Sequence, residues 1–586
     1  MTEPIRIANC SGFFGDRLSA AKEMVDGGPI DVLTGDWLAE LTMLILARTQ
    51  LKHPGSGYAR TFLTQMEQVM GACLDRSIKV VSNAGGLDPA ACAEAIAQVA
   101  NTLGLVPTIA YVNGDDLLPR VGELSASGHL LDFDSNEAIN DLSSFITANA
   151  YLGCFGIAEA LSMGADIVIT GRVTDAALVC GPAAWHHDWR RDNFDALAGA
   201  VVAGHAVECG AQVTGGNYSF FDEIPSMERI GFPWVDVFED GSSIVGKHDG
   251  TGGEVSIGTV TSQLLYEIAS PSYYGPDVTA RFDTITLEQV EQDRVRMSGV
   301  HGEAPPATLK VAMNKIGGYR KDLVVALTGL DIEQKARLVE TAFWRACPFQ
   351  PDEYDSVTTK LLRTDKADSP TNEESVALWR LTLKDRDERK VGRIVADALV
   401  ELALATVPGF FIPGSPPSAG TPFGVYRPAR VPSNLVPQYI TVLGGERTVI
   451  DSVAPTRAVH VVANEGSRAA APSGSTTLAP LGDVCGARSG DKGGDANLGV
   501  FTRSDEAFAW LDGYLSVAEL RRLLPETAEF EIDRYRLPAL RALNFVIHDL
   551  LDEGVAASTR QDAQAKGLGE WLRSRYVDVP TALLAQ

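Results

Sequence analysis

The sequence lacks the marks of several protein classes. Its eight cysteines form no C-x-x-C pair and no regular spacing, which argues against a disulfide framework or a cysteine zinc site. No apolar run approaches the ~18 residues of a membrane-spanning helix. The first residues also lack the basic flank and apolar stretch of a signal peptide. We therefore expect a cytoplasmic protein with reduced thiols and no membrane partner.

Positive charge is also scarce. The chain has 50 Lys and Arg residues against 76 Asp and Glu residues, which gives a formal net charge of −26. A surface of that sign repels nucleic acids and anionic lipids, so we expect no nucleic-acid partner. An anionic substrate would need a local basic pocket.

Nucleotide-binding and hydrolase motifs are missing as well. No G-x-G-x-x-G follows an early strand-like run, and no G-x-S-x-G nucleophile elbow occurs. GSSIVGKH at 241–248 fits G-x-x-x-x-G-K, but His248 replaces the hydroxyl that binds magnesium, and Asp-Gly pairs flank the segment as in a hairpin. We expect no cofactor and no resident metal ion.

The first 180 residues repeat one pattern, in which a short apolar run precedes a polar cluster and a helical segment. Alternation of strands and helices indicates a parallel sheet with helices on both faces. We predict a parallel-sheet, Rossmann-like α/β main domain, with a helix at 89–103 capped by Asp88. Short β-like runs with Gly and Pro turns at about 210–330 predict β-hairpin insertions. The predicted strands lie at 5–8, 30–33, 79–81, 108–112 and 165–169.

Polar residues follow these predicted strands. Ligands of such sheets bind beyond the carboxyl ends of the strands, so these clusters would together form one composite site. The substrate-binding candidates from the first three clusters are Asn9, Asn83, Gly85 and Gly86.

Arg172 and Asp175, in ITGRVTDAAL, follow a predicted strand and open a helix. The helix N-terminus together with Arg172 would form a fixed site for an anion. Asp175 could act as a general base, or it could simply cap the helix.

His205 and Glu208 differ by three positions and would share one face of a helix, just before Thr214, Gly215 and Gly216. The spacing suits an acid/base pair, a metal pair that lacks an obvious third ligand, or a hydrogen bond at the helix end. Cys209 follows directly and could be a nucleophile or a small buried hydrophobe.

The stretch GARSGDKGGDANLG at 486–499 combines five glycines with four charged residues. We interpret it as a loop that binds an anionic ligand through backbone N–H groups and the side chains between the glycines. The alternative is a solvated turn that ends a strand. The candidates here are Arg488, Ser489, Asp491, Lys492 and Asn497.

A stretch of small and polar residues without periodicity, NEGSRAAAPSGSTTLAP, predicts a linker at 464–478. It divides the chain into a main domain at 1–463 and a smaller C-terminal domain at 479–586.

Several long motifs carry a family resemblance: ANAYLGCFGIAEAL, GADIVITGRVTDAAL, GHAVECGAQVTGGNY, TSQLLYEIASPSYYGPDV and GARSGDKGGDANLG. With them the chain resembles the acyclic terpene utilization family AtuA over nearly its whole length. The resemblance implies an AtuA-like main domain and a ferredoxin-like α+β fold for 479–586. It also implies a role in the catabolism of terpenoids such as citronellol through branched acyl-CoA thioesters.

The leading hypothesis is a cofactor-independent lyase or hydratase that acts on a branched acyl-CoA or a related carboxylic acid. Asp175 or Glu208 would be the base and His205 the acid or orienting partner, while Arg172 and the Asn83 loop would hold the oxyanion. One alternative is a thioester hydrolase or acyl transferase that uses Cys209 with His205. The other is a non-catalytic binding or scaffold subunit beside acyl-CoA carboxylases. By analogy with other long α/β enzymes we expect a homo-oligomer.

Overall fold

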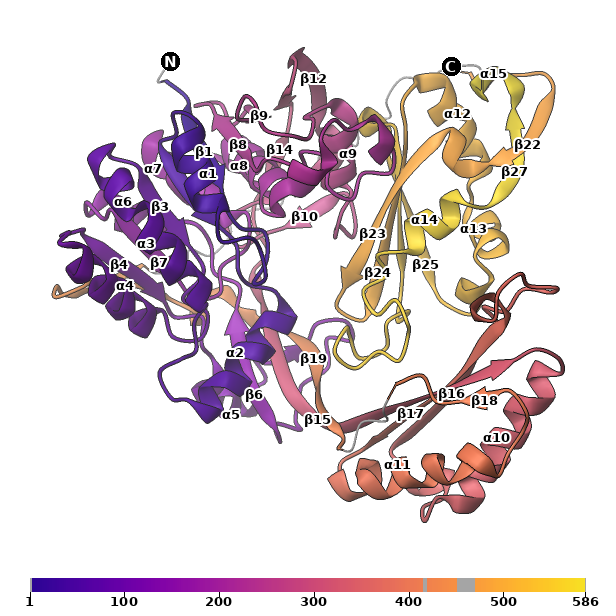
Figure 1. Ribbon diagram of the computed structural model, residues 1–586. Coiled ribbons are helices and arrows are strands. Elements are labelled where there is room, and N and C mark those ends of the chain that lie inside the picture. Colours follow the sequence, from indigo (N-terminus) through magenta and orange to yellow (C-terminus); the bar gives the residue numbers. More distant parts are fainter. Residues whose placement is uncertain (1–2, 415–418, 451–469, 585–586) are drawn as a thin grey trace. The chain divides into compact units, whose positions relative to one another are not determined.

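The computed structural model describes all residues except 1–2, 415–418, 451–469 and 585–586, and the chain forms two compact units (Figure 1). The first comprises Met1–Asn314, Tyr426–Val555 and Gln564–Gln586, and the second comprises Lys315–Val425 and Ala556–Ala563. Their boundaries differ from those of the predicted domains at 1–463 and 479–586. Residues 464–469 of the predicted linker lie outside the described residues, and β22 begins at Thr476.

An 11-stranded sheet forms the centre of the first unit. Its five middle strands are parallel, and all five of the predicted strands form them. Antiparallel strands extend both edges, so the sheet as a whole is mixed. The middle strands are, in spatial order, β1 (Ile5–Asn9), β2 (Val32–Gly35), β3 (Lys79–Ser82), β7 (Ile167–Thr170) and β4 (Ile109–Asn113). The outer strands are β12 (Thr286–Glu291), β13 (Arg294–Ser298), β9 (Ser243–Lys247) and β8 (Pro233–Val237) on one side, and β20 (Gln438–Val442) and β21 (Arg447–Ile450) on the other.

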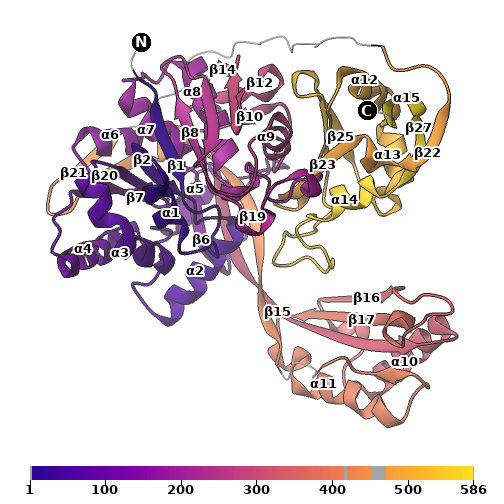
Figure 2. The same cartoon turned by 45° about the horizontal axis from the view of Figure 1, so that its top comes forward.

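Side chains of the middle strands alternate between two apolar cores. Ile7 and Val168 enter one core, whereas Ala8 and Ile169 enter the other. Helices therefore cover both faces of these strands, and α3 and α4 lie side by side on one of them (Figures 1 and 2). The first core contains α6 (Phe155–Ser162), α7 (Ala177–His186) and α8 (Phe194–Val207), and the second contains α1 (Ala20–Gly27), α3 (Arg60–Asp75) and α4 (Pro89–Leu103).

Local sequence signals place several of these elements as predicted. Helix α4 spans Pro89–Leu103, and the Asp88 side chain accepts a hydrogen bond from the Ala91 N–H at 3.0 Å, as expected of an N-cap. The predicted hairpins include β8 and β9, which pair antiparallel and add to the sheet beside β1.

The C-terminal part of the first unit carries a separate four-stranded antiparallel sheet. Its buried core draws side chains such as Leu511, Leu520 and Phe545 from helices and strands together. Helices α12 and α13 lie against this sheet (Figure 2). The elements are β23 (Cys485–Lys492), β24 (Asp495–Thr502), β26 (Ala542–Ile547) and β25 (Ile532–Leu537), with α12 (Asp505–Tyr514), α13 (Val517–Leu523) and α14 (Leu568–Arg573).

The glycine-rich stretch at 486–499 is not a loop, so that prediction is wrong. It forms the hairpin of β23 and β24, in which Lys492 pairs with Asp495 across a two-residue turn. The strand pairing occupies backbone N–H groups that the predicted loop would have offered to a ligand. The glycines serve close packing instead, because a Cβ atom on Gly490 would come within 2.4 Å of the Tyr266 ring.

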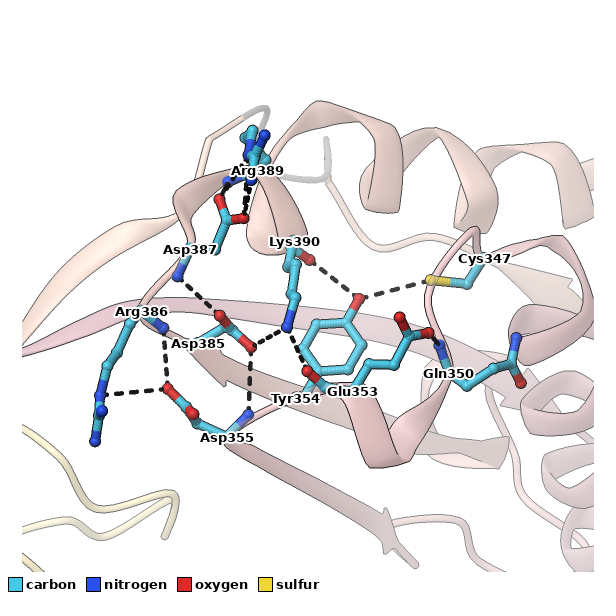
Figure 3. A network of polar contacts seen from close by, with 10 residues as sticks. All are labelled: Cys347, Gln350, Glu353, Tyr354, Asp355, Asp385, Arg386, Asp387, Arg389 and Lys390. Carbon is cyan, nitrogen blue, oxygen red and sulfur yellow. Dashed lines mark hydrogen bonds and ion pairs between the residues drawn. The ribbon is translucent and has the colours of Figure 1, made fainter.

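The second unit contains three long antiparallel strands of a seven-stranded sheet, with two helices packed on one face. A network of polar contacts closes one end of it (Figure 3). The Asp385 carboxylate accepts hydrogen bonds from the Lys390 ammonium at 3.0 Å and from the Asp355 N–H at 3.3 Å. The Tyr354 hydroxyl donates to the Lys390 carbonyl at 3.0 Å. The elements are β15 (Thr308–Thr328), β16 (Ser356–Leu362), β17 (Val376–Asp385), α10 (Ile332–Ala346) and α11 (Arg393–Val400).

Candidate functional site

Residues that follow the parallel strands are linked by buried hydrogen bonds. The Asn83 amide, after β3, donates to the Asp36 carboxylate, after β2, at 2.6 Å. The Arg172 N–H, after β7, donates to the Asp115 carboxylate, after β4, at 3.0 Å. The carboxyl edge of the sheet thus forms one connected polar layer, as the parallel arrangement requires.

Arg172 is almost fully buried in this layer and is held from three sides. One terminal nitrogen donates to the Asp175 carboxylate at 2.7 Å and to the Leu38 carbonyl at 3.3 Å. The guanidinium lies over the Tyr151 ring, 4.1 Å from its centroid. Its Nε atom is buried and has no hydrogen-bond partner among the described residues. An unpaired buried donor of this kind is uncommon in folded proteins and is often found at a site of function.

The end of α8 contributes a second pair of groups. Nδ1 of His205 lies 2.9 Å from Oε1 of Glu208, outside hydrogen-bonding geometry, and Oε2 of Glu208 has no partner among the described residues. Burial, followed by the nearby Asp175 and Glu267 carboxyls, raises the pKa of Glu208 well above its ordinary value. Burial and the Lys492 ammonium lower the pKa of His205 to about 4. Burial therefore favours the uncharged form of both groups, a carboxylic acid beside a neutral imidazole.

Cys209, the next residue, does not have the environment of a reactive thiol. Burial and the neighbouring Glu208 and Glu267 carboxyls raise the thiol pKa well above its ordinary value. A nucleophilic cysteine needs the opposite shift, which nearby cations or a helix N-terminus provide.

Strand β23 brings two cations to the same region from the C-terminal part of the chain. The Lys492 ammonium donates to the Glu267 carbonyl at 2.7 Å and lies 5.7 Å from the centroid of the Tyr273 ring. Burial and the Lys310 ammonium lower the pKa of Lys492. Arg488 hydrogen-bonds the Gln212 side chain and stacks on the ring of Tyr266 at 4.2 Å.

Asp491, between these two cations in sequence, holds its proton unusually strongly. Burial, with repulsion from the Glu267 and Glu40 carboxyls, raises its pKa to about 8. Burial also raises the pKa of Glu267, although the Tyr266 hydroxyl and Lys492 oppose the shift. Both carboxyls therefore hold a proton more strongly than an exposed carboxyl does, a shift that is common at functional sites.

Comparison with known protein families shows which family the chain belongs to. The family model described as acyclic terpene utilisation family protein AtuA matches residues 5–442. The chain belongs to this family. The AtuA ferredoxin-like domain model matches residues 479–578, which covers the four-stranded sheet of the C-terminal part. No curated protein and no solved structure matches the chain significantly. Membership in the AtuA family implies a role in acyclic terpene utilisation.

Several residues of this AtuA chain join the site without any signal in the sequence. Glu40, the first residue of α2 (Glu40–Lys52), accepts hydrogen bonds from the Tyr151 hydroxyl at 3.0 Å and from the Lys310 ammonium at 3.3 Å. Burial opposes its ionisation, but Lys310 and Arg172 outweigh burial and lower the pKa of Glu40 to about 2. We call the whole group the charged cluster. Its members are Glu40, Tyr151, Arg172, Asp175, His205, Glu208, Glu267, Tyr273, Lys310 and Lys492.

Other predicted site residues hold the surrounding backbone. Both polar ends of Asn83 are engaged, since its oxygen also accepts the Trp37 N–H at 2.8 Å. The Asn497 oxygen accepts the Glu267 N–H at 2.8 Å and so fixes the loop that carries Glu267. The Asn9 amide reaches the Glu208 carbonyl at 3.4 Å. Asn497 and Asn9 therefore position members of the charged cluster, whereas Asn83 fixes Asp36 and the backbone at Trp37 beside it.

The remaining candidates lie in packed turns or strands. The Thr214 hydroxyl donates to the Gly231 carbonyl at 2.6 Å, and the Ser489 hydroxyl accepts the Gly569 N–H at 3.0 Å. The four candidate glycines allow close backbone approach, and a Cβ atom on any of them would meet neighbouring atoms at less than 3 Å. They are Gly85, Gly86, Gly215 and Gly216.

Two classes of feature are absent from the part of the chain that the structure describes. None of its helices is long and apolar enough to cross a membrane. No group of three or more His, Cys, Asp or Glu side chains in this part could hold a metal ion.

Proposed function

We propose that this chain is a cofactor-independent lyase or hydratase that acts on a branched acyl-CoA or a related carboxylic acid in acyclic terpenoid catabolism. The observation that carries the proposal is the pairing of a proton-holding Glu208 with the Arg172–Asp175 pair inside one charged cluster. Two carboxyl groups in different environments are what a proton-transfer reaction needs, because one must give up a proton while the other accepts one.

In the dehydration direction Asp175 takes the proton α to the thioester carbonyl, and the electrons of that C–H bond form the C=C bond. The β C–O bond breaks, and Glu208 donates its proton to the leaving hydroxyl, which departs as water. Transfer of the proton from Asp175 back to Glu208 restores the starting state. Hydration is the reverse of these steps.

Positive charge stabilises the enolate character that develops on the carbonyl oxygen. Arg172 and Lys492 belong to the same cluster as the two carboxyls and act on Glu208 electrostatically. The Arg172 guanidinium, 2.7 Å from Asp175, also keeps the base in position. His205 is neutral at pH 7, which suits a partner that orients Glu208 and does not suit an acid.

The Rossmann-like interpretation of the five parallel strands agrees with this assignment, since such sheets bind ligands at their carboxyl edge. The family description supports a branched, terpenoid-derived substrate. A β-hydroxyacyl thioester carries its own leaving group, the β-hydroxyl, and its carbonyl acidifies the α-proton, so the chemistry needs no added cofactor. The raised thiol pKa of Cys209 speaks against covalent catalysis at that residue.

The test measures exchange of the α-protons of citronellyl-CoA with solvent deuterium by NMR. It is followed by a search for the dehydrated enoyl-CoA product when the 3-hydroxy derivative of the same thioester is supplied. Wild-type protein should exchange the α-proton. Asp175→Asn and Glu208→Gln should reduce the rate by about 10²- to 10⁴-fold while both variants remain folded, as a cooperative unfolding transition shows. The matched control is Glu94→Gln, an exposed carboxyl on α4 that should exchange at the wild-type rate. Equal exchange by all three variants would contradict the assigned roles.

A further inference from the structure

Three cations from three different elements act on one ionised carboxylate in the charged cluster. Lys310, on β15, lies 3.3 Å from Glu40, and Arg172 and Lys492 also lower the pKa of this carboxyl. Arg172 comes from the end of β7 and Lys492 from the end of β23. The concentration of positive charge stands out because the whole chain carries a net charge of −26.

The carboxyl groups around these cations neutralise them incompletely. Burial and neighbouring carboxyls raise the pKa values of Asp36 and Glu208 well above the ordinary range, which favours the protonated form of both. Asp491 likewise keeps its proton up to a pH of about 8. The charged and titratable groups in and around the cluster are its members as defined above, His205, Tyr151 and Tyr273 included, together with Asp36, Arg488 and Asp491.

Four hydrogen-bonding atoms of the cluster are buried without partners among the described residues. They are Nε of Arg172, which is a donor, Oε2 of Glu208, and both ring nitrogens of His205. Arg172 is 2% exposed and Glu208 is 8% exposed, so water does not readily compensate either atom. An unpaired donor inside a region of excess positive charge is complementary to an anionic oxygen.

We infer that the charged cluster binds a free carboxylate group of the substrate, which Arg172 and Lys492 hold between the sheet edge and the β23–β24 hairpin. The inference rests on the proposed function for the identity of the site and narrows its substrate class. The substrate is a branched acid that retains one ionised carboxylate, whether or not another carboxyl carries a thioester. An uncharged analogue of the same shape lacks the charge that the site recognises.

Binding should also be coupled to proton uptake. An added negative charge near Asp491 and Glu208 makes their ionisation still harder, so a partly ionised carboxyl takes up a proton when the ligand binds. Near pH 8, where Asp491 is about half protonated, this uptake is largest. A neutral ligand produces no such electrostatic effect.

The experiment is isothermal titration calorimetry of the full-length protein with two branched acids, citronellate and methylsuccinate, and with their amides. Each titration is done at pH 8 in two buffers of different ionisation enthalpy, which reports the number of protons taken up. At least one acid should bind with net proton uptake, and its amide should bind at least roughly 10-fold more weakly.

Lys492→Met should weaken binding of the acid by roughly 10- to 100-fold, because a charge-assisted hydrogen bond is lost. Lys492→Arg keeps the charge and should retain most of the affinity, which separates loss of charge from misfolding. Lys22→Met, at an exposed lysine on α1 paired with Asp26, is the matched control and should bind as the wild type does.

Equal binding of acid and amide, proton release on binding, or no binding of either acid to the wild type would overturn the inference. The outcome is independent of the deuterium exchange test. Exchange on citronellyl-CoA without carboxylate recognition leaves the proposed function standing and removes the inferred substrate class. Carboxylate binding without exchange supports the recognition of a carboxylate and contradicts the proposed lyase or hydratase function.

Discussion

Oε1 of Glu208 lies 2.9 Å from Nδ1 of His205, and burial favours the neutral form of each of the two groups. The pair is therefore not a salt bridge despite the short distance. Burial disfavours both charged forms, and Lys492 disfavours the imidazolium further. Because burial raises its pKa, the Glu208 carboxyl keeps its proton to a higher pH than an exposed glutamate does.

The neutral state of His205 predicts an acid-sensitive stability. Its pKa falls from the ordinary 6.5 to about 4 in the folded protein, so between these values the unfolded chain takes up a proton that the folded chain does not. The free energy of unfolding then decreases as the pH falls through this window, by about 3 kcal/mol in total. His205→Gln should remove this part of the pH dependence in urea denaturation measured from pH 7 to pH 4. His129→Gln, at an exposed position, should leave it unchanged, and an identical slope for His205→Gln and the wild type would refute the neutral imidazole.

Asp491 predicts the opposite pH dependence, in which the free energy of unfolding decreases as the pH rises. Its folded pKa is about 8 against an ordinary value of 3.8, so the folded state keeps a proton that the unfolded state releases. The carboxyl therefore lowers the free energy of unfolding increasingly as the pH rises from about 4 to about 8. Asp491→Asn should raise the melting temperature above that of the wild type at pH 8 and have little effect at pH 4. Asp222→Asn, at an exposed carboxyl, is the control, and a gain from Asp491→Asn that does not grow with pH would count against the raised pKa.

The sequence predicted those parts of the site that depend on local pattern. Strand ends were recognisable from apolar runs, and because parallel strands share a carboxyl edge, Arg172 and Asp175 could be assigned to that edge before the structure was known. The helical spacing of His205 and Glu208 placed both on one face of α8. In each case the position of the residue could be predicted from its neighbours in the sequence or from one rule of sheet topology.

The missed residues depend on long-range packing. Glu40 and Lys310 are 270 positions apart in the chain, and nothing in the sequence near either residue announces their ion pair. The glycines at 486–499 were misread for a related reason. Gly490 leaves room for Tyr266 and Gly499 for Leu265, two residues that directly follow α9 (Ile257–Leu264). A distant packing partner of this kind cannot be read from the glycines themselves.

Gly490 gives a direct test of that packing role. A Cβ atom there would come within 2.4 Å of the buried ring of Tyr266, which Arg488 covers from the other side. Gly490→Ala should lower the free energy of unfolding by about 1–3 kcal/mol, as overpacking does. Gly513→Ala, in α12, is the matched control because a Cβ atom there meets nothing within 4 Å. Alanine favours helix, so this control should be neutral or stabilising by up to about 1 kcal/mol. Equal effects of the two variants in urea denaturation would show that the hairpin does not need a glycine at 490.

Arg172 is the cation whose shape matters as well as its charge. A terminal nitrogen of its guanidinium bonds Asp175 and the Leu38 carbonyl while its plane lies over Tyr151, an arrangement that a lysine ammonium does not reproduce. Arg172→Lys should therefore lower the free energy of unfolding by about 1–3 kcal/mol even though the charge is kept. In a double-mutant cycle with Asp175→Asn, the two substitutions should show a coupling energy of about 1 kcal/mol or more, since they break one shared contact. The cycle is measured by urea denaturation at pH 7, and additive effects of the two substitutions would mean that the 2.7 Å contact does not stabilise the folded protein.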